Sequence, residues 1–218
     1  MRLKSLLICA GFIAFGLLPG TSVSAEGQDK APDFIQSIQV YEAVISYPPP
    51  MWIKAGEPIG QSEYFRHQNG PEFIFEQIPK GQKFESWTQL YAVRGDYIKL
   101  DQDVSLDAYL SMSLQPFIDI CGQENATVQR ISESGSSGTF LLICQDTPHA
   151  PEGGVYGKGT GEVALFHFAK VNDTFVKVYH EWRGKSFLVQ NPETWPVKQD
   201  VLVSAIERFQ SISVFAAN

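Results

Sequence analysis

The sequence is poor in cysteine and in basic residues, and each shortage limits what the chain can do. Only three cysteines are present and no Cys-x-x-Cys motif occurs, which argues against a redox-active dithiol. The 17 Lys and Arg residues are outnumbered by 24 Asp and Glu residues, for a formal net charge of -7. Because binding to phosphates requires a clustered basic face and none is visible, we expect no nucleic acid among the partners.

Long apolar runs and motifs for covalent or phosphate chemistry are also missing. No run after the N-terminal segment approaches the about 18 residues that a membrane-spanning helix requires, so we expect no membrane span once the leader described next is removed. Residues 135–138 are one residue too short for a Gly-x-Ser-x-Gly nucleophile motif. The glycines of residues 153–161 precede a predicted strand, whereas a phosphate loop requires a helix, so we interpret them as a surface loop. We predict no catalytic residue and no cofactor.

Residues 1–25 have the three-part layout of a secretory signal. Arg2 and Lys4 supply the basic start, residues 6–18 form a short apolar core, and Ala25 ends a run of small residues. A lipoprotein signal at Cys9 is disfavoured, since only about three apolar residues would precede it, against about seven in a working signal. We therefore predict cleavage after Ala25, a periplasmic or secreted product, and a disordered lead over residues 26–35.

Removal of this leader leaves two cysteines, Cys121 and Cys144. In an oxidising compartment such a pair is interpreted first as a disulfide, here closing a loop of about 23 residues. A bond over that span stabilises a fold by about 3 kcal/mol, mainly through the unfolded state. The alternative is a pair of buried free thiols.

The rest of the chain, residues 36–218, is expected to form one domain that is large enough to bury a core. Residues 38–47 are rich in Val, Ile and Tyr and predict one strand, which the prolines at 48–50 end. Residues 63–66 are expected to pair with residues 73–78 across a turn. Two further strands are predicted, over residues 87–93 and 139–144.

Two helices are predicted from apolar residues that recur three or four positions apart. The first covers residues 106–121, with Ser105 as its cap and Gly122 as its stop. Pro116 removes one backbone hydrogen bond from this helix, so we expect a kink or a break near residue 115. The second helix falls within residues 197–212 and carries an apolar stripe.

The clearest hairpin joins residues 162–171 to residues 174–182 through a two-residue turn, Asn172-Asp173. In this register the numbers of paired residues sum to 345. Both faces of the hairpin are largely apolar, with Lys170, Lys177 and Glu181 towards the edges of one, so both must be covered. These elements predict an α+β fold, in which helices pack on an antiparallel β-sheet.

His167 and His180 are weak candidates for a metal site. They lie diagonally on one face of the predicted hairpin, within reach of a shared ligand. A zinc site needs at least a third ligand, and no Asp or Glu lies on that face. The favoured interpretation is therefore two partly buried histidines without a metal.

The numerous aromatic residues of the chain are interpreted as part of the core, although some could line a groove.

Two further segments carry short motifs. The first combines residues 47–52 with Ile78-Pro79-Lys80-Gly81-Gln82 and Trp87-Thr88. The second comprises Cys144 and the hairpin that ends at residues 179–184. Both resemble a group of exported bacterial proteins of unknown function that share an I-P-x-G-(Q/E) … W-T stretch, and the resemblance spans most of residues 41–208. It implies a fold like that of PsbP and DcrB proteins, an α-β-α sandwich, and an accessory or binding role without catalytic residues.

These observations favour a non-catalytic accessory or binding protein of the periplasm in a Gram-negative-type envelope. Its partner would be an envelope protein or a small ligand, bound through the sheet or the glycine loop. The alternative is a small hydrolase or metal-dependent enzyme that uses His167 and His180 together with a carboxylate brought in by the fold.

Overall fold

The computed structural model describes residues 35–54, 57, 60–99, 104–151 and 157–217. The predicted leader (residues 1–25), nearly all of the predicted lead, and residues 152–156 of the glycine segment lie outside the described residues. Within the described part, the chain forms mainly antiparallel strands together with two α-helices, so the predicted α+β class is confirmed. No helix in these ranges is long and apolar enough to span a bilayer.

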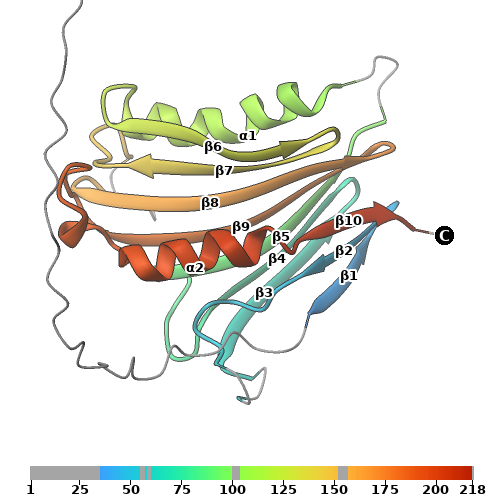
Figure 1. The fold of residues 1–218 in the computed structure, drawn as a ribbon, viewed down its shortest axis with the longest axis horizontal. Helices are drawn as coiled ribbons and strands as arrows, with labels where there is room; N and C mark the ends of the chain where they lie inside the picture. The colour runs from blue at the N-terminus through green and yellow to red at the C-terminus, as the bar shows by residue number, and fades with distance from the viewer. Residues whose placement is uncertain (1–34, 55–56, 58–59, 100–103, 152–156, 218) are drawn as a thin grey trace, which may run out of the picture.

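The strands form a small sheet and a large sheet (Figure 1). The small sheet has the order β1-β2-β10 and the large one the order β3-β4-β5-β9-β8-β7-β6. Every pairing in both sheets is antiparallel. The strands are β1 (Gln36–Val40), β2 (Ala43–Tyr47), β3 (Ser62–Asn69), β4 (Glu72–Pro79), β5 (Gln89–Tyr97), β6 (Ala126–Ser134), β7 (Ser137–Cys144), β8 (Thr160–Val171), β9 (Thr174–Lys185) and β10 (Ser213–Ala216).

The first helix, α1 (Leu106–Cys121), has the predicted bounds and the predicted caps. Ser105 Oγ accepts a hydrogen bond of 3.1 Å from the backbone N–H of Ala108, and Gly122 takes a positive φ of 73°. Of the kink or break predicted near residue 115, the break is wrong, because α1 is one helix from end to end. The cost of the missing bond, about 3 kcal/mol in an isolated helix, is offset by packing of the helix on the sheet through its buried residues.

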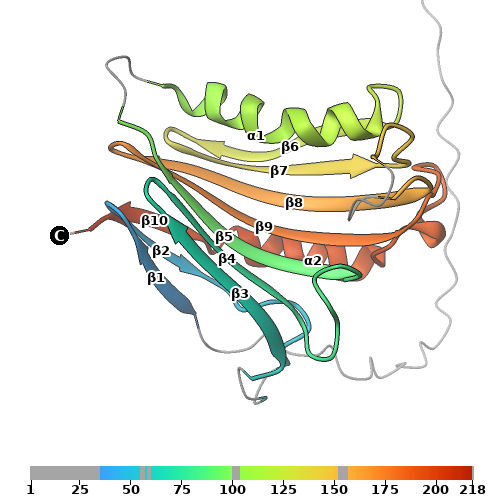
Figure 2. The ribbon, with the colours of Figure 1, turned by 180° about the vertical axis from the view of Figure 1, so that it is seen from behind.

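The second helix, α2 (Gln199–Phe209), is shorter at both ends than the predicted range, and a short 3-10 helix, η1 (Pro192–Thr194), precedes it. Its apolar stripe faces the large sheet as expected, with Leu202, Ala205 and Phe209 buried. Figure 1 shows α2 on the near side of β8 and β9, and Figure 2, seen from behind, shows it on the far side of β5 and β9. The helix therefore covers one face of the sheet only.

The hairpin predictions have mixed outcomes. The β8–β9 register is confirmed, since Val171 pairs with Thr174 and Glu162 with Arg183. The predicted β3–β4 pairing is confirmed as well, and its strands extend to a tighter turn than expected. The single strand predicted over residues 38–47 is wrong: β1 and β2 form a hairpin, with Tyr41 at a φ of 50° in the turn. An alternating apolar pattern does not reveal a two-residue turn when neither turn residue is Gly, Asn or Asp.

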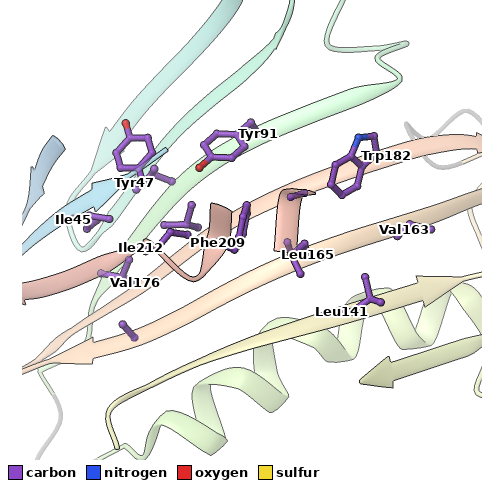
Figure 3. Close-up of a cluster of buried hydrophobic side chains, with 14 of the residues drawn as sticks. Ile45, Tyr47, Tyr91, Leu141, Val163, Leu165, Val176, Trp182, Phe209 and Ile212 are labelled. Atoms are coloured by element: carbon purple, nitrogen blue, oxygen red, sulfur yellow. The ribbon is translucent and has the colours of Figure 1, made fainter. Parts of the chain in front are cut away.

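The main core fills the space between the large sheet, α2 and the small sheet. Side chains from β2, β5, β7, β8, β9 and α2 point into this space in Figure 3. The two sheets approach closely at Gly95 in β5, where a Cβ atom would lie 2.3 Å from a methyl carbon of Val40 in β1. Only glycine fits at this position without a shift of one sheet away from the other.

Candidate functional site

His167 and His180 lie on the α2 face of the large sheet, in the diagonal positions that the register predicts. His167 is almost fully buried, and its Nδ1 lies 3.0 Å from the hydroxyl oxygen of Thr139. Burial lowers the pKa of His167 to about 4, so its imidazole is neutral at pH 7.

His180 is fully buried and surrounded by aromatic rings. Its ring stacks on Trp182 with centroids 3.9 Å apart, and Trp52 and Tyr91 meet it edge-on. Neither ring nitrogen has a hydrogen-bond partner within the described residues, and burial holds its pKa well below the ordinary value. No three His, Cys, Asp or Glu side chains gather as a metal site anywhere in the described ranges. The structure therefore brings the two histidines onto one face without bringing a third ligand to them.

Cys121 and Cys144 form the predicted disulfide, with Cα atoms 5.7 Å apart. The bond joins the last residue of α1 to the last residue of β7, and both side chains are buried. It fixes the C-terminal end of α1 over the sheet, on the face opposite α2. The position of α1 in turn decides which part of that face stays open.

Alternate residues of β9 on this second face carry polar or charged ends: Lys177, Tyr179, Glu181 and Arg183. All four are buried, with between 3 and 8% of their surface exposed. Helix α1 packs mainly on β7 and β8, although its Tyr109 also reaches Asp96 of β5. Figure 2 shows no helix over β4 and β5 among the described residues. The charged side of β9 therefore lies beside α1 instead of beneath it.

Two adjoining hollows follow this edge of α1, and we call them together the α1 groove. The larger has a volume of about 520 Å³ and the smaller about 280 Å³, and Phe117 and Lys177 line both. The larger is lined by Pro71, Glu72, Arg94, Asp96, Tyr97, Ile98, Tyr109, Met112, Ser113, Pro116, Phe117 and Lys177. The smaller is lined by Glu76, Phe84, Trp87, Leu90, Phe117, Lys177, Tyr179, Glu181 and Arg183.

Paired charges occupy the two ends of the α1 groove. At one end Arg94 binds the carboxylate of Asp96 through two nitrogens at 2.9–3.2 Å, and Tyr109 donates its hydroxyl to the same carboxylate at 2.5 Å. At the other end Arg183 pairs with Glu162 at 3.4 Å and lies 3.6 Å from the ring centre of Trp87. Burial raises the pKa of Glu162 to about 7, although the Arg183 charge opposes this shift.

Lys177 and Glu181, between these ends, have no such partners. The Lys177 ammonium lies over the rings of Tyr179 and Phe166, at 4.9 and 5.7 Å. Neither Lys177 nor Glu181 makes a hydrogen bond or an ion pair with any described residue. Burial lowers the pKa of Lys177 to about 8 and raises that of Glu181 well above its ordinary value. Lys177 and Glu181 act on each other electrostatically, and the polar end of each faces the groove without a hydrogen bond.

Sequence reasoning missed the α1 groove, although one signal for it was present. It placed Lys177 and Glu181 on the correct face of the hairpin but assigned them to its edges. Charged residues at every second or fourth position of a central strand, within an otherwise apolar face, point to a polar recess in that face. Arg94 and Asp96 lie two positions apart on β5, and Glu162 faces Arg183 within the β8–β9 hairpin, so each pair is local. Only the placement of β5 beside β9 brings both pairs to one groove.

Comparisons with known proteins identify no relative by sequence. No protein-family model matches the chain, and no curated protein matches it. Among solved structures, the chain is similar to the Saccharomyces cerevisiae Ran-binding protein Mog1p and to a point mutant of Mog1. Each match has a TM-score of 0.43 and 9% sequence identity, and covers 83% of this chain and 95% of that one. A likeness of this size supports no inference about the role of this chain.

Proposed function

We propose that the mature chain is an exported, non-catalytic binding protein that takes its ligand in the α1 groove. One observation carries this proposal: an unpaired ammonium and an unpaired carboxyl group, Lys177 and Glu181, line the same open hollow. Neither polar end is among the buried atoms that lack a partner, so both reach the hollow, where a ligand can meet them. Perturbed, unpaired ionisable groups in a cleft are typical of a functional site, where a ligand supplies the missing partner.

Export is the second part of the proposal. It is supported by the signal-like residues 1–25 and by the Cys121–Cys144 disulfide, a bond that persists in oxidising compartments. The resemblance to exported proteins with a PsbP- or DcrB-like fold belongs to the same proposal. The antiparallel sheet between α1 and α2 is compatible with that fold.

The enzyme alternative, in which His167 and His180 act with a carboxylate, receives no support from the site geometry. A catalytic imidazole must come within about 2.6–3.2 Å of a reacting group. His180 is fully covered by Trp182, Trp52 and Tyr91, and a substrate would first have to displace them.

Export is tested by the intact mass of the protein recovered from the periplasm of an expressing Gram-negative cell. The mass should correspond to a chain that begins at Glu26 and carries one disulfide. A product that begins at Met1, or two thiols that alkylate under non-reducing denaturation, would contradict the export proposal.

The groove is tested by a fragment screen on isotope-labelled protein, followed by nuclear magnetic resonance. Amphipathic fragments should shift the amide signals of β5, β9 and α1, including those of Leu90, Phe117 and Glu181. The signals of α2 provide the internal control, because α2 lies on the opposite face. Fragment shifts confined to α2 or the small sheet would count against the α1 groove as the binding site.

A further inference from the structure

Lys177 and Glu181 lie on the same face of one strand, four positions apart. At about 3.3 Å per residue, their Cα atoms are separated by about 13 Å. The two side chains do not close into an ion pair in this structure, and Tyr179 projects from the strand between them. One cation and one acid therefore face the smaller hollow from either side of an aromatic ring.

The other charged groups around them are already engaged. Arg94 and Asp96 of β5 bind each other, and Glu162 of β8 binds Arg183 of β9 through Oε2. The other Glu162 oxygen has no partner among the described residues, but Glu162 lines neither hollow of the groove. Glu76 of β4 accepts a hydrogen bond of 3.2 Å from the Tyr179 hydroxyl, while on α1 Tyr109 donates to Asp96. What remains for a ligand is a donor at Lys177 and an acid at Glu181.

The walls between these two groups are apolar. Phe84, Trp87, Leu90 and Phe117 line the smaller hollow, and its volume of about 280 Å³ suits a molecule much smaller than a folded domain. A simple fatty acid would pair with Lys177 and leave Glu181 unpaired, whereas a simple amine would do the reverse. A ligand that satisfies both groups needs an anionic end, a cationic end and an apolar side chain.

We infer that the α1 groove binds a small zwitterion with an apolar side chain, of the class of free amino acids and short peptides. The ligand carboxylate accepts hydrogen bonds from the Lys177 ammonium, and the ligand ammonium donates to the Glu181 carboxylate. The apolar side chain packs against Phe84, Leu90 and Phe117. This inference rests on the proposed function, because it assigns a ligand class to the same groove.

The protonation states support this pairing. Burial raises the pKa of Glu181, and an arriving ammonium favours the ionised form of its carboxyl group. Binding should therefore lower this pKa and release protons over the pH range in which Glu181 titrates. The charged groups that face Glu181 and oppose or favour this ionisation are Glu76, Glu162, Lys177 and Arg183.

Isothermal titration calorimetry with glycyl-L-phenylalanine tests the inference on the mature protein. The dipeptide should bind, while its N-acetyl and C-terminal amide forms, which each lack one charge, should bind at least about tenfold more weakly. Free L-phenylalanine is titrated as a second zwitterion. Whichever of the two binds more tightly shows whether the groove prefers free amino acids or short peptides. Titration in two buffers of different ionisation enthalpy measures the proton release without any substitution.

Two variants assign the ligand ends. Lys177→Met should remove the preference for a free carboxylate, and Glu181→Gln should remove both the preference for a free ammonium and the proton release. Lys185→Met on the same strand and Glu207→Gln on α2, both at exposed residues, are the matched controls and should bind as the parent does. Melting curves of each variant establish that it is folded.

Equal binding of the dipeptide and its two blocked forms would overturn the zwitterion inference. If neither zwitterion binds but fragments still map to the α1 groove, the ligand class is wrong and the proposed function stands. If the fragments also fail to bind in the α1 groove, both the ligand class and the proposed function are wrong.

Discussion

The two faces of the large sheet are formed by alternate residues of the same strands, yet they are covered differently. On the α2 face, α2 and the small sheet together enclose an apolar core that includes Leu165, Val178 and Trp182. On the other face, α1 covers β7 and β8 and leaves the charged side of β9 beside an open groove. Both faces have a buried apolar cluster, but the α1 face also carries the charged side chains of the groove.

The different covering of the two faces explains why His180 is buried on one and Lys177 and Glu181 lie on the other. His180 is tolerated on the enclosed face because an imidazole can be buried as a neutral group among aromatic rings. Lys177 and Glu181 on the open face still carry unpaired polar ends, which an entirely structural face would replace with apolar side chains. On the enclosed face a buried ionisable group is part of the core, whereas on the open face it is available to a ligand.

The largest expected effect tests the packing of the enclosed face. Trp182→Ala removes a side chain that is only 2% exposed in the main core, and it should lower the free energy of unfolding by about 3–5 kcal/mol. Urea denaturation followed by fluorescence measures the loss. Val203→Ala on the exposed side of α2 is the control and should change stability by less than about 0.5 kcal/mol. A small loss for Trp182→Ala would mean that the enclosed face is not the main source of stability.

The next effect concerns the disulfide on the open face. Replacing Cys121 and Cys144 together by serine should cost about 3 kcal/mol, since the loop of 23 residues is no longer closed in the unfolded state. Hydrogen exchange should locate the loosening at the C-terminal end of α1 and in β7, with α2 unchanged. Equal loosening of α1 and α2 would contradict the prediction that the disulfide stabilises only the α1 face.

His167 on the enclosed face and Glu181 on the open face should contribute to the free energy of unfolding with opposite pH dependence. Burial lowers the pKa of His167 from 6.5 to about 4, so below pH 6.5 the unfolded chain binds a proton that the native chain does not. This contribution lowers stability by up to about 3 kcal/mol as the pH falls from 6.5 to 4. Burial raises the pKa of Glu181 above 4.5, so its contribution instead falls as the pH rises from 4.5.

Two variants separate these contributions in urea titrations between pH 4 and 7.5. His167→Gln keeps a hydrogen-bonding group near Thr139 and should make stability less sensitive to acid. Glu181→Gln should make the remaining fall in stability on acidification steeper, since the opposing contribution is lost. If both variants change the slope in the same direction, the assignment of opposite signs is incorrect.

The smallest effect is expected for Lys177→Met. The substitution keeps the length of the side chain and removes a buried ammonium without a hydrogen-bond partner, so stability should change by less than about 1 kcal/mol or increase. Thermal melting measures this change. A loss of several kcal/mol would indicate that Lys177 supports the fold rather than a ligand.

Local patterns were sufficient to predict several elements. The β8–β9 register follows from the Asn172-Asp173 turn, where Asn172 takes a φ of 52° as a two-residue turn requires. The bounds of α1 follow from its apolar spacing together with Ser105 and Gly122. The turn at Tyr41 was missed because its residues carry no turn signal, and the chain turns there because β1 and β2 pair.

The amino-acid sequence alone determined the α+β class, the central hairpin, the first helix and the pairing of Cys121 with Cys144, because these depend on short-range periodicity, turn chemistry and the number of cysteines. Only the tertiary structure decided which face of β9 is enclosed and which is open. Phe117 of α1 is 60 positions before Lys177 in the chain, and the disulfide brings the end of its helix over β7 rather than over β5. The burial of Lys177 and Glu181 follows from that placement, and no property of β9 itself specifies it.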